Sequence, residues 1–320
     1  MYRWLDNSLH NFCEMMDEKR LPHAVLIVGG EGLGVSDLAH EMARQYLCTS
    51  DRSKDCRCRS CVLMQAFTHP DYKEIKKSSL SIGIDDLRKG IEILESTAGN
   101  AHGKVLYING AGDMTAPAAN ALLKTLEEPP ANSFIILSAK NVECLLPTVV
   151  SRTVRFQIEQ PSIEELNECT ASEVGIPGDY KQELSICGMS PEKAAAMVKD
   201  GTDKKISEAL KKLEAAASAP DNIGVLASYL DTSFKDPNLL FGFMYALIKE
   251  ARYAQISGSN DDLILLKDAP EARKKIMSID PDDLVGAHRQ IMALKGVPGM
   301  KTTMVNQLQL FTFFSALLGI

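Results

Sequence analysis

Residues 29–36 have the spacing of a loop that binds phosphate groups. The segment Gly29-Gly30-Glu31-Gly32-Leu33-Gly34-Val35-Ser36 follows an apolar run, Ala24–Val28, precedes a helical pattern and fits G-x-x-x-x-G-x-S. In a working loop, glycines let backbone N–H groups surround the phosphates, a lysine bridges the last two phosphates, and a Ser or Thr hydroxyl reaches magnesium. Val35 takes the lysine position. We therefore predict a loop of this shape, built on Gly29, Gly32, Gly34 and Ser36, that does not bind ATP.

Two other interpretations of this loop stay open. It could be a glycine-rich turn that only packs a helix on a strand. It could also be a dinucleotide-binding loop, but the glycines read Gly30-x-Gly32-x-Gly34 and not G-x-G-x-x-G, which disfavours that interpretation.

A second apolar run, Lys104–Ile108, predicts a strand of the kind that ends in paired acids in phosphate-loop ATPases. One acid holds magnesium and the other orients the attacking water. Here the run continues with Asn109 and Gly110, and Asp113 comes several residues too late for that role. Two losses in one site predict that the chain does not hydrolyse ATP by itself.

Four of the eight cysteines, Cys48, Cys56, Cys58 and Cys61, lie within one short polar segment. Four thiolates suit tetrahedral zinc in a closed, structural site. The single residue between Cys56 and Cys58 makes it harder for both thiolates to face one metal, so free surface thiols are the alternative. We expect the four scattered cysteines to be core residues: Cys13, Cys144, Cys169 and Cys187.

The composition is that of an ordinary globular protein, with 320 residues, 45% of them hydrophobic and 24% charged, and a formal net charge of −7. No apolar run approaches the roughly 18 residues that a membrane-spanning helix needs, and the first residues lack the layout of a secretory signal. We expect a cytoplasmic protein without a membrane partner. Its negative charge disfavours independent binding of nucleic acid, so any action on DNA would take place within an assembly.

Short apolar runs alternate with helical patterns up to about residue 158, which predicts an α/β domain with a parallel sheet. The candidate strands are Ala24–Val28, Tyr72–Ile75, Val105–Ile108, Phe134–Ser138 and Val154–Phe156. Gln160-Pro161-Ser162 marks a boundary, with Ser162 placed to cap a helix that begins at Ile163. The rest is predicted to be helical, with breaks at Gly175 and Gly188 and a final apolar helix over Val305–Leu318.

The run Asn120-Ala121-Leu122-Leu123-Lys124-Thr125-Leu126-Glu127-Glu128-Pro129-Pro130 closely resembles the AAA+ family of bacterial clamp loaders. Leu21-Pro22-His23-Ala24, Thr68-His69-Pro70-Asp71 and Ser151-Arg152 are similar to the same family in the same order. The resemblance is strong over residues 20–158 and weak in the terminal helices. It implies an AAA+ nucleotide-binding-like domain over 1–158 with a zinc module at 48–61, a small helical lid domain over 159–204 and a helical collar, for oligomerisation, over 205–320.

The resemblance also implies a function and partners. The family's gamma or tau subunits keep the lysine and the acids, so Val35, Asn109 and Gly110 place this chain with a member that does not hydrolyse ATP. Such a member assembles with the gamma or tau ATPase subunits and the delta subunit to load the beta sliding clamp onto primed DNA. The alternatives are a motor subunit in which Lys104 or Lys124 replaces the lysine, and a small-molecule kinase or other phosphate-loop enzyme.

One arginine has an implied catalytic role in a neighbouring subunit. The family's Ser-Arg-Cys motif supplies an arginine to ATP bound next door, and here it reads Ser151-Arg152-Thr153. A guanidinium can stabilise charge on the transferred phosphate. The alternative is an arginine on a solvated loop or in a surface ion pair. In the turn that resembles a sensor motif, Gly188–Ala194, we assign no role to Glu192 or Lys193.

Overall fold

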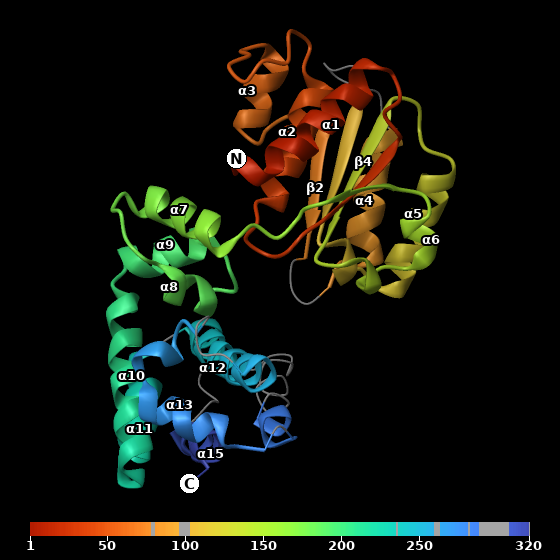
Figure 1. Ribbon diagram of the computed structural model, residues 1–320. Coiled ribbons are helices and arrows are strands. Elements are labelled where there is room, and N and C mark those ends of the chain that lie inside the picture. Colours follow the sequence, from red (N-terminus) through yellow and green to blue (C-terminus); the bar gives the residue numbers. More distant parts are fainter. Residues whose placement is uncertain are drawn as a thin grey trace. The chain divides into compact units, whose positions relative to one another are not determined.

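The computed structural model describes residues 1–77, 81–95, 103–234, 236–258, 263–280, 282–287 and 307–319. It divides into two compact units, Met1–Pro161 and Ser162–Ile320 (Figure 1). Each unit has its own hydrophobic core.

The first unit is built on a five-stranded parallel sheet in the order β2-β3-β4-β1-β5. All five predicted strands are present, four of them longer by one or two residues than predicted. Their bounds are β1 Ala24–Val28, β2 Tyr72–Lys76, β3 Lys104–Asn109, β4 Ser133–Ala139 and β5 Val154–Gln157. Side chains of β1 are buried at every position because helices cover both faces of the sheet.

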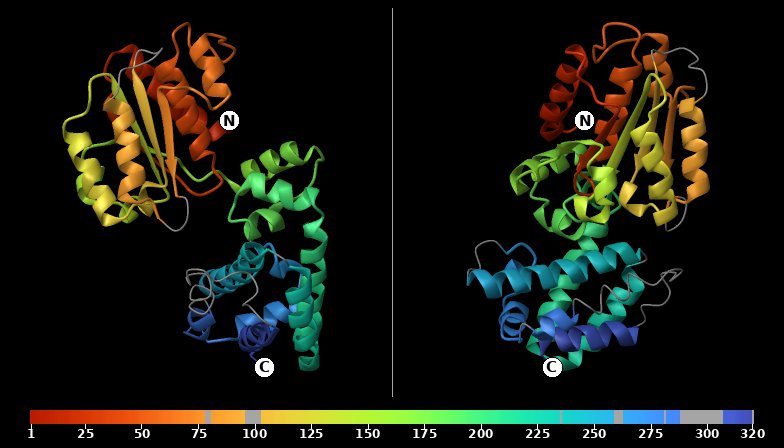
Figure 2. Two further views of the ribbon diagram at one scale, coloured as in Figure 1. Left: turned by 180° about the vertical axis from the view of Figure 1, so that it is seen from behind. Right: turned by 90° about the vertical axis from the view of Figure 1, so that its right-hand side faces the viewer.

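Helices α1 and α2 cover one face of the sheet, and α4, α5 and α6 cover the other (Figure 2). The helices of this unit are α1 Asp6–Asp17, α2 Val35–Leu47, α3 Arg59–Gln65, α4 Ile84–Glu95, α5 Ala116–Glu127 and α6 Pro147–Val150, with 3-10 turns η1 Arg3–Leu5, η2 Ala111–Asp113 and η3 Val142–Cys144. Leu38, Ala39, Met42 and Ala43 are buried because they lie on the face of α2 that packs on the sheet.

The second unit is helical throughout the residues described. Its helices are α7 Ile163–Val174, α8 Lys181–Ile186, α9 Pro191–Lys199, α10 Thr202–Ser218, α11 Ile223–Ser233, α12 Pro237–Ser257, α13 Pro270–Met277 and α15 Gln307–Leu318, with 3-10 turns η4 Pro220–Asn222 and η5 Leu266–Asp268. The predicted final helix is present from Gln307, and its predicted first residues, Val305 and Asn306, lie outside the described residues.

The helix after the predicted boundary begins as expected. Ser162 accepts a hydrogen bond from the backbone N–H of Glu165, and the Glu165 carboxylate accepts one from the backbone of Ser162. α7 ends at Val174 and is followed by Gly175, whose φ of 83° is the left-handed conformation that suits glycine at this position. The further division of this unit near residue 204 stays a prediction. Among the described residues, no helix combines the length and the apolar character needed to cross a bilayer.

Candidate functional site

The predicted loop follows β1 at the carboxyl end of the sheet, where parallel sheets usually bind ligands. The backbone N–H of Gly29 donates to the carbonyl of Ala139 on β4 at 3.1 Å. Gly32 and Gly34 have φ values of 82° and 77°, which favour glycine, and α2 begins directly afterwards at Val35. The backbone therefore has the strand, loop and helix order that the sequence predicts.

Residues near the N-terminus pack closely on this loop. A Cβ atom on Gly34 would lie 2.8 Å from the ring of Tyr2 and 2.9 Å from Leu5. The indole N–H of Trp4 donates to the carbonyl of Leu33 at 3.0 Å, and the Tyr2 and Trp4 rings stack with centroids 4.5 Å apart. These contacts leave no room for a larger residue at position 34, and no pattern in the sequence predicts them.

Val35 makes apolar contacts where the lysine of a working loop would extend toward phosphate. A Cβ atom on Gly29 would lie 2.8 Å from Val35 Cγ2 and 3.0 Å from the Cβ of Ile158. The side chain thus lies against the backbone of the loop itself. It offers neither charge nor a hydrogen bond to a phosphate.

The hydroxyl of Ser36, which would reach magnesium in a working loop, has protein partners. It accepts hydrogen bonds from Asn109 Nδ2 at 3.3 Å and from the Tyr107 hydroxyl at 3.4 Å. Asn109 also donates to Glu74 Oε1 at 2.9 Å, and the Tyr107 hydroxyl lies 3.1 Å from Ser138 Oγ. Burial raises the pKa of Tyr107, so this phenol stays protonated as a donor. Sequence reasoning missed Glu74, Tyr107 and Ser138.

The position of the second expected acid is held in a conformation that suits glycine. β3 ends at Asn109, and Gly110 follows with φ 83° while its N–H donates to Ser138 Oγ at 3.1 Å. A Cβ atom on Gly110 would lie 3.0 Å from Asp113 Oδ2. Asp113 itself forms an ion pair with Lys77 at 3.0 Å, beyond the end of the strand.

The two lysines considered as replacements lie elsewhere. Lys104 is the first residue of β3, is 4% exposed and donates to the carbonyl of Ile93 at 2.8 Å. Lys124 is exposed in the last turn of α5, also away from the loop. Sequence reasoning missed Lys140, which directly follows β4 and pairs with Glu31 of the loop at 3.0 Å.

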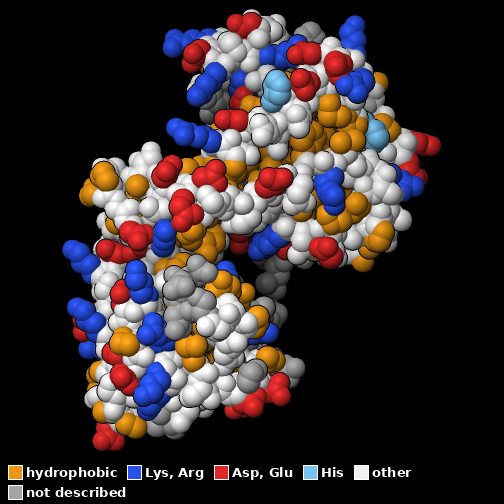
Figure 3. Space-filling view, viewed as in Figure 1, with side chains coloured by type: hydrophobic (Ala, Val, Ile, Leu, Met, Phe, Trp, Pro, Cys, Tyr) orange, Lys and Arg blue, Asp and Glu red, His pale blue; other side chains and the backbone are white. Residues whose placement is uncertain are grey.

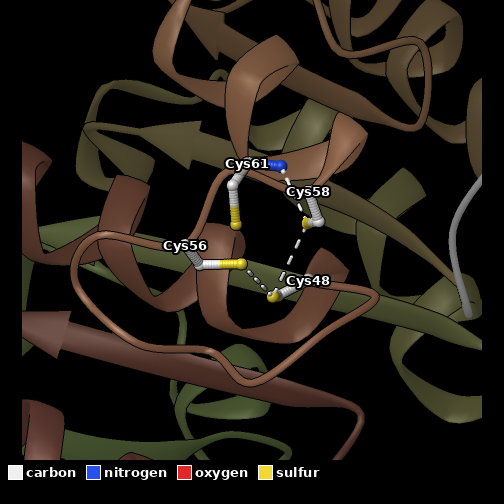
Figure 4. A group of neighbouring side chains, drawn as sticks. All are labelled: Cys48, Cys56, Cys58 and Cys61. Atoms are coloured by element: carbon white, nitrogen blue, oxygen red, sulfur yellow. Dashed lines mark hydrogen bonds between the residues drawn. The ribbon is translucent and has the colours of Figure 1, made fainter.

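The four clustered cysteines converge on one point (Figure 4). Their Sγ atoms all lie within 4.8 Å of one another, and Cys48 Sγ lies 3.6 Å from Cys56 Sγ and 3.8 Å from Cys58 Sγ. Zinc–sulfur bonds of about 2.3 Å in a tetrahedron give sulfur separations of about 3.8 Å. The arrangement therefore fits a tetrahedral metal, and the short spacing between Cys56 and Cys58 does not prevent it.

Local structure explains how the short spacing is accommodated. Cys58 is the extended residue just before α3, and its sulfur accepts a hydrogen bond from the backbone N–H of Cys61 at 3.4 Å. Burial opposes the charged thiolate, but this bond and others from Thr49 lower the pKa of Cys58 to about 6. Burial raises the pKa of Cys61. Of these two thiols, that of Cys58 is therefore the more readily ionised.

A buried hydrogen-bond chain joins the segments that carry these cysteines. Ser60, which precedes Cys61, donates to the carbonyl of Leu47 at 2.6 Å, and Leu47 precedes Cys48. His69 Nδ1 accepts from the backbone N–H of Asp71 at 3.0 Å, so its Nε2 carries the proton and donates to Ser60 Oγ at 2.8 Å. Burial lowers the pKa of His69. The chain fixes the two segments side by side.

The expectation that the scattered cysteines are core residues was wrong for Cys144, whereas Cys187 packs against the hydrophobic core of the second unit. Cys144 is exposed, and Cys13, Cys169 and Cys187 are only partly buried. Cys144 lies in the short turn η3, where its sulfur reaches the carbonyl of Asn141 at 2.9 Å and so stays at the surface.

Arg152 lies at the amino end of the sheet, opposite the loop. It precedes β5, whose first residue, Val154, pairs with Val25 near the start of β1. Since β1 spans about 13 Å, the turn is on the far side of the sheet from the loop that follows Val28. Ser151 is exposed in the same turn, and its hydroxyl donates to the carbonyl of Thr148 at 3.2 Å.

The guanidinium of Arg152 is held at the surface by neighbouring groups. It forms an ion pair with Glu127 at 2.7 Å and donates to the carbonyl of Thr148 at 3.0 Å and to Ser151 Oγ at 3.2 Å. The side chain is 35% exposed and that of Glu127 is 54% exposed. Sequence reasoning named Arg152 and missed this partner, although Glu127 belongs to the motif at residues 120–130.

The sensor-like turn has a local structural function. Ser190 caps α9 by accepting a hydrogen bond from the N–H of Lys193, and Gly188 and Met189 have positive φ. Glu192 and Lys193 are exposed at the start of α9. Basic and acidic side chains are interspersed over the face shown in Figure 3.

Comparisons with known proteins match mainly the first unit. The family model described as DNA polymerase III, delta subunit, matches residues 4–162. A DNA polymerase III subunit delta' of Haemophilus influenzae is 40% identical over 166 residues, 51% of either chain. One from Escherichia coli is 39% identical over 155 residues, 47% of this chain and 46% of that one. The chain thus spans about half the length of the curated relatives it matches.

A solved structure extends the likeness of fold to the whole chain. The DNA polymerase III, gamma subunit-related protein of Thermotoga maritima covers 97% of this chain, and 98% of its own, with a TM-score of 0.52. At 19% identity this likeness concerns the fold alone. The parallel sheet with its helices, followed by a helical unit, is an AAA+ fold, as the sequence predicts.

Proposed function

We propose that this chain, whose residues 4–162 are homologous to DNA polymerase III delta prime subunits, is a non-hydrolysing subunit of the sliding-clamp loader. In this role it assembles in the cytoplasm with gamma or tau ATPase subunits and the delta subunit. Together they open the beta clamp and load it onto primed DNA. We further propose that residues 159–204 form a lid domain and residues 205–320 a collar that joins the subunits.

The observation that carries the proposal is the hydrogen-bond network among Ser36, Asn109 and Tyr107 at the loop. The Ser36 hydroxyl accepts hydrogen bonds from Asn109 and Tyr107, where a working loop would direct it to magnesium. No carboxylate stands at either expected position, since Asn109 is neutral and Gly110 has no side chain. Binding of Mg-ATP would require the loss of these bonds with no lysine at position 35 to compensate.

The position of Arg152 supports a role at a nucleotide bound by a neighbouring subunit. It lies at the opposite end of β1 from its own loop, so within this chain it cannot reach a phosphate bound there. At an interface between subunits, an arginine of this kind can accelerate phosphoryl transfer on the order of a thousandfold or more. The ion pair with Glu127 holds the guanidinium at the surface. The exposed Ser151 next to it would belong to the same interface between subunits.

We also propose that Cys48, Cys56, Cys58 and Cys61 hold one structural zinc ion. Four thiolate ligands leave no open position for substrate, so the metal would cross-link the end of α2 to α3.

Equilibrium binding of Mg-ATP to the isolated chain tests the proposal. We expect no binding at millimolar nucleotide, whereas assembly with gamma or tau and delta subunits should give a loader that hydrolyses ATP. Tight binding with turnover by the isolated chain would instead establish a motor subunit. Lys140 is then the residue to replace, because among the three lysines compared it is the one bonded to the loop.

A further inference from the structure

Arg44 makes an unusually complete set of hydrogen bonds beside the four cysteines. It lies in the last turn of α2, and its side chain is 11% exposed. Its Nε donates to Glu41 Oε2 at 2.8 Å and its Nη2 to Glu41 Oε1 at 2.6 Å and to the Arg52 carbonyl at 3.3 Å. Its Nη1 donates to the Ser53 carbonyl at 3.2 Å and to Cys61 Sγ at 3.2 Å. An arginine has five N–H donors, and each has an acceptor here.

These bonds tie together the segments that deliver the cysteines. Arg44 belongs to the helix that ends at Cys48, bonds directly to the sulfur of Cys61 and holds the backbone of residues 52–53, which lead to Cys56. Gln45 adds a bond to the Arg52 carbonyl at 3.1 Å. The anchoring matters at Arg52, because its φ of 59° is a conformation that costs energy for a residue with a side chain.

We propose that Arg44 is a positioning residue for the metal site, in that its N–H···S bond and its hold on residues 52–53 arrange the thiolates before a metal binds. This inference rests on the zinc site proposed above. Glu41 orients the guanidinium through two bonds, much as a carboxylate orients a metal-binding histidine from behind. Since the Glu41 carboxylate balances the charge of Arg44, Arg44 acts on the Cys61 sulfur chiefly by orienting it and not through net charge.

The geometry specifically requires arginine. A lysine would keep the positive charge, but its three donors on one nitrogen cannot reach Glu41, the two carbonyls and the sulfur together. If Arg44 served only as a helix ion pair, its replacement would lower the stability of the metal-free chain and leave the affinity for metal unchanged.

The test measures zinc affinity of the full chain by competition with a chromophoric chelator. Wild type is compared with Arg44→Met, Arg44→Lys and, as a matched control, Arg88→Met, because Arg88 also pairs with an acid three residues earlier on a helix of the same unit, Asp85. We expect roughly 10- to 100-fold weaker binding for Arg44→Met, an intermediate loss for Arg44→Lys and no change for Arg88→Met. With Co²⁺ as probe, the sulfur-to-metal charge-transfer band should shift in the Arg44 variants only.

The outcomes separate the two proposals. Zinc binding by Arg44→Met as tight as that of wild type would overturn the role of Arg44 while leaving the metal site in place. Absence of zinc binding by wild type would overturn the metal site and, with it, the role of Arg44. If Arg44→Met does not fold, Glu41→Gln carries the test, because it leaves Arg44 present but removes one charged anchor. Unchanged affinity in that variant would count against the inference.

Discussion

The two ends of the parallel sheet differ in what their polar groups do. At the carboxyl end, where ligands usually bind, the hydroxyl of Ser36 and the amide of Asn109 bond to each other and to neighbouring side chains. At the amino end, Arg152 is held at the surface. Helix α2 begins at the loop and returns toward this end, where Cys48 follows it and the four sulfur atoms converge without a covalent bond between them. Under the proposed function, the amino end is therefore where this chain would act, on a partner through Arg152 and on a metal through the four cysteines.

The largest expected effect concerns Arg152. In a loader reconstituted with this chain, Arg152→Ala should slow hydrolysis at the adjoining ATP site on the order of a thousandfold, because the guanidinium no longer stabilises the transferred phosphate. Single-turnover hydrolysis of ATP measures this directly. Arg155→Ala, an exposed arginine three residues away, serves as control and should have little effect. Equal rates of ATP hydrolysis with the two variants would show that Arg152 has no special role at the amino end of the sheet.

The second effect compares ligands at the two ends. Removing zinc with a chelator should lower the Tm of the first unit by roughly 10 °C, if zinc is present at about a thousand times its Kd. Millimolar Mg-ATP should leave the Tm unchanged, because the loop has no lysine and the Ser36 hydroxyl already accepts bonds from Asn109 and Tyr107. Differential scanning fluorimetry measures both shifts. If Mg-ATP raised the Tm by more than chelation lowered it, the carboxyl end and not the amino end would be the main ligand site.

The third effect is a pH dependence that arises at the amino end. Burial lowers the pKa of His69 below its ordinary value, although the charge of Asp71 opposes the shift. The unfolded chain therefore binds a proton more readily, so stability is present above about pH 6.5 and is lost as pH falls, by up to about 1.4 kcal/mol per pH unit. Urea unfolding between pH 5 and 7.5 should show a shallower dependence for His69→Gln. An identical slope in both proteins would argue against the neutral, buried histidine.

The smallest effect is expected at the loop itself. Ser36→Ala removes a hydroxyl that only accepts bonds from Asn109 and Tyr107, so it should cost about 1 kcal/mol or less in the free energy of unfolding. ATP turnover by the assembled loader should not change. A marked loss of turnover would show that the carboxyl end takes part in catalysis after all.

Local patterns predicted most of the backbone of the first unit. Parallel strands that are buried on both faces read as apolar runs, which is why Ala24–Val28 was identified to the residue. Ser162 was predicted as a cap because the bonds that it makes reach only three residues along the chain. The absence of the lysine at position 35 follows from spacing alone.

The partners of the site residues were beyond sequence reasoning because they come from distant segments. Glu74 reaches Asn109 only through the pairing of β2 with β3, and Glu127 reaches Arg152 across 25 residues of chain. The doubt about Cys56 and Cys58 had a similar origin. Spacing does not reveal that Cys58 is extended and that its sulfur accepts a bond from the first turn of a helix.

The backbone at Gly110 makes it difficult for a mutation to introduce an acidic residue at the carboxyl end of the sheet. Its φ of 83° and the carboxylate of Asp113, 3.0 Å from where a Cβ would lie, mean that a mutation to glutamate would produce a strained residue beside a like charge. Under the proposed function, a change to a hydrolysing subunit would need a different backbone at Gly110 together with a lysine at position 35. Neither change would be useful without the other, so selection would have no single step to favour.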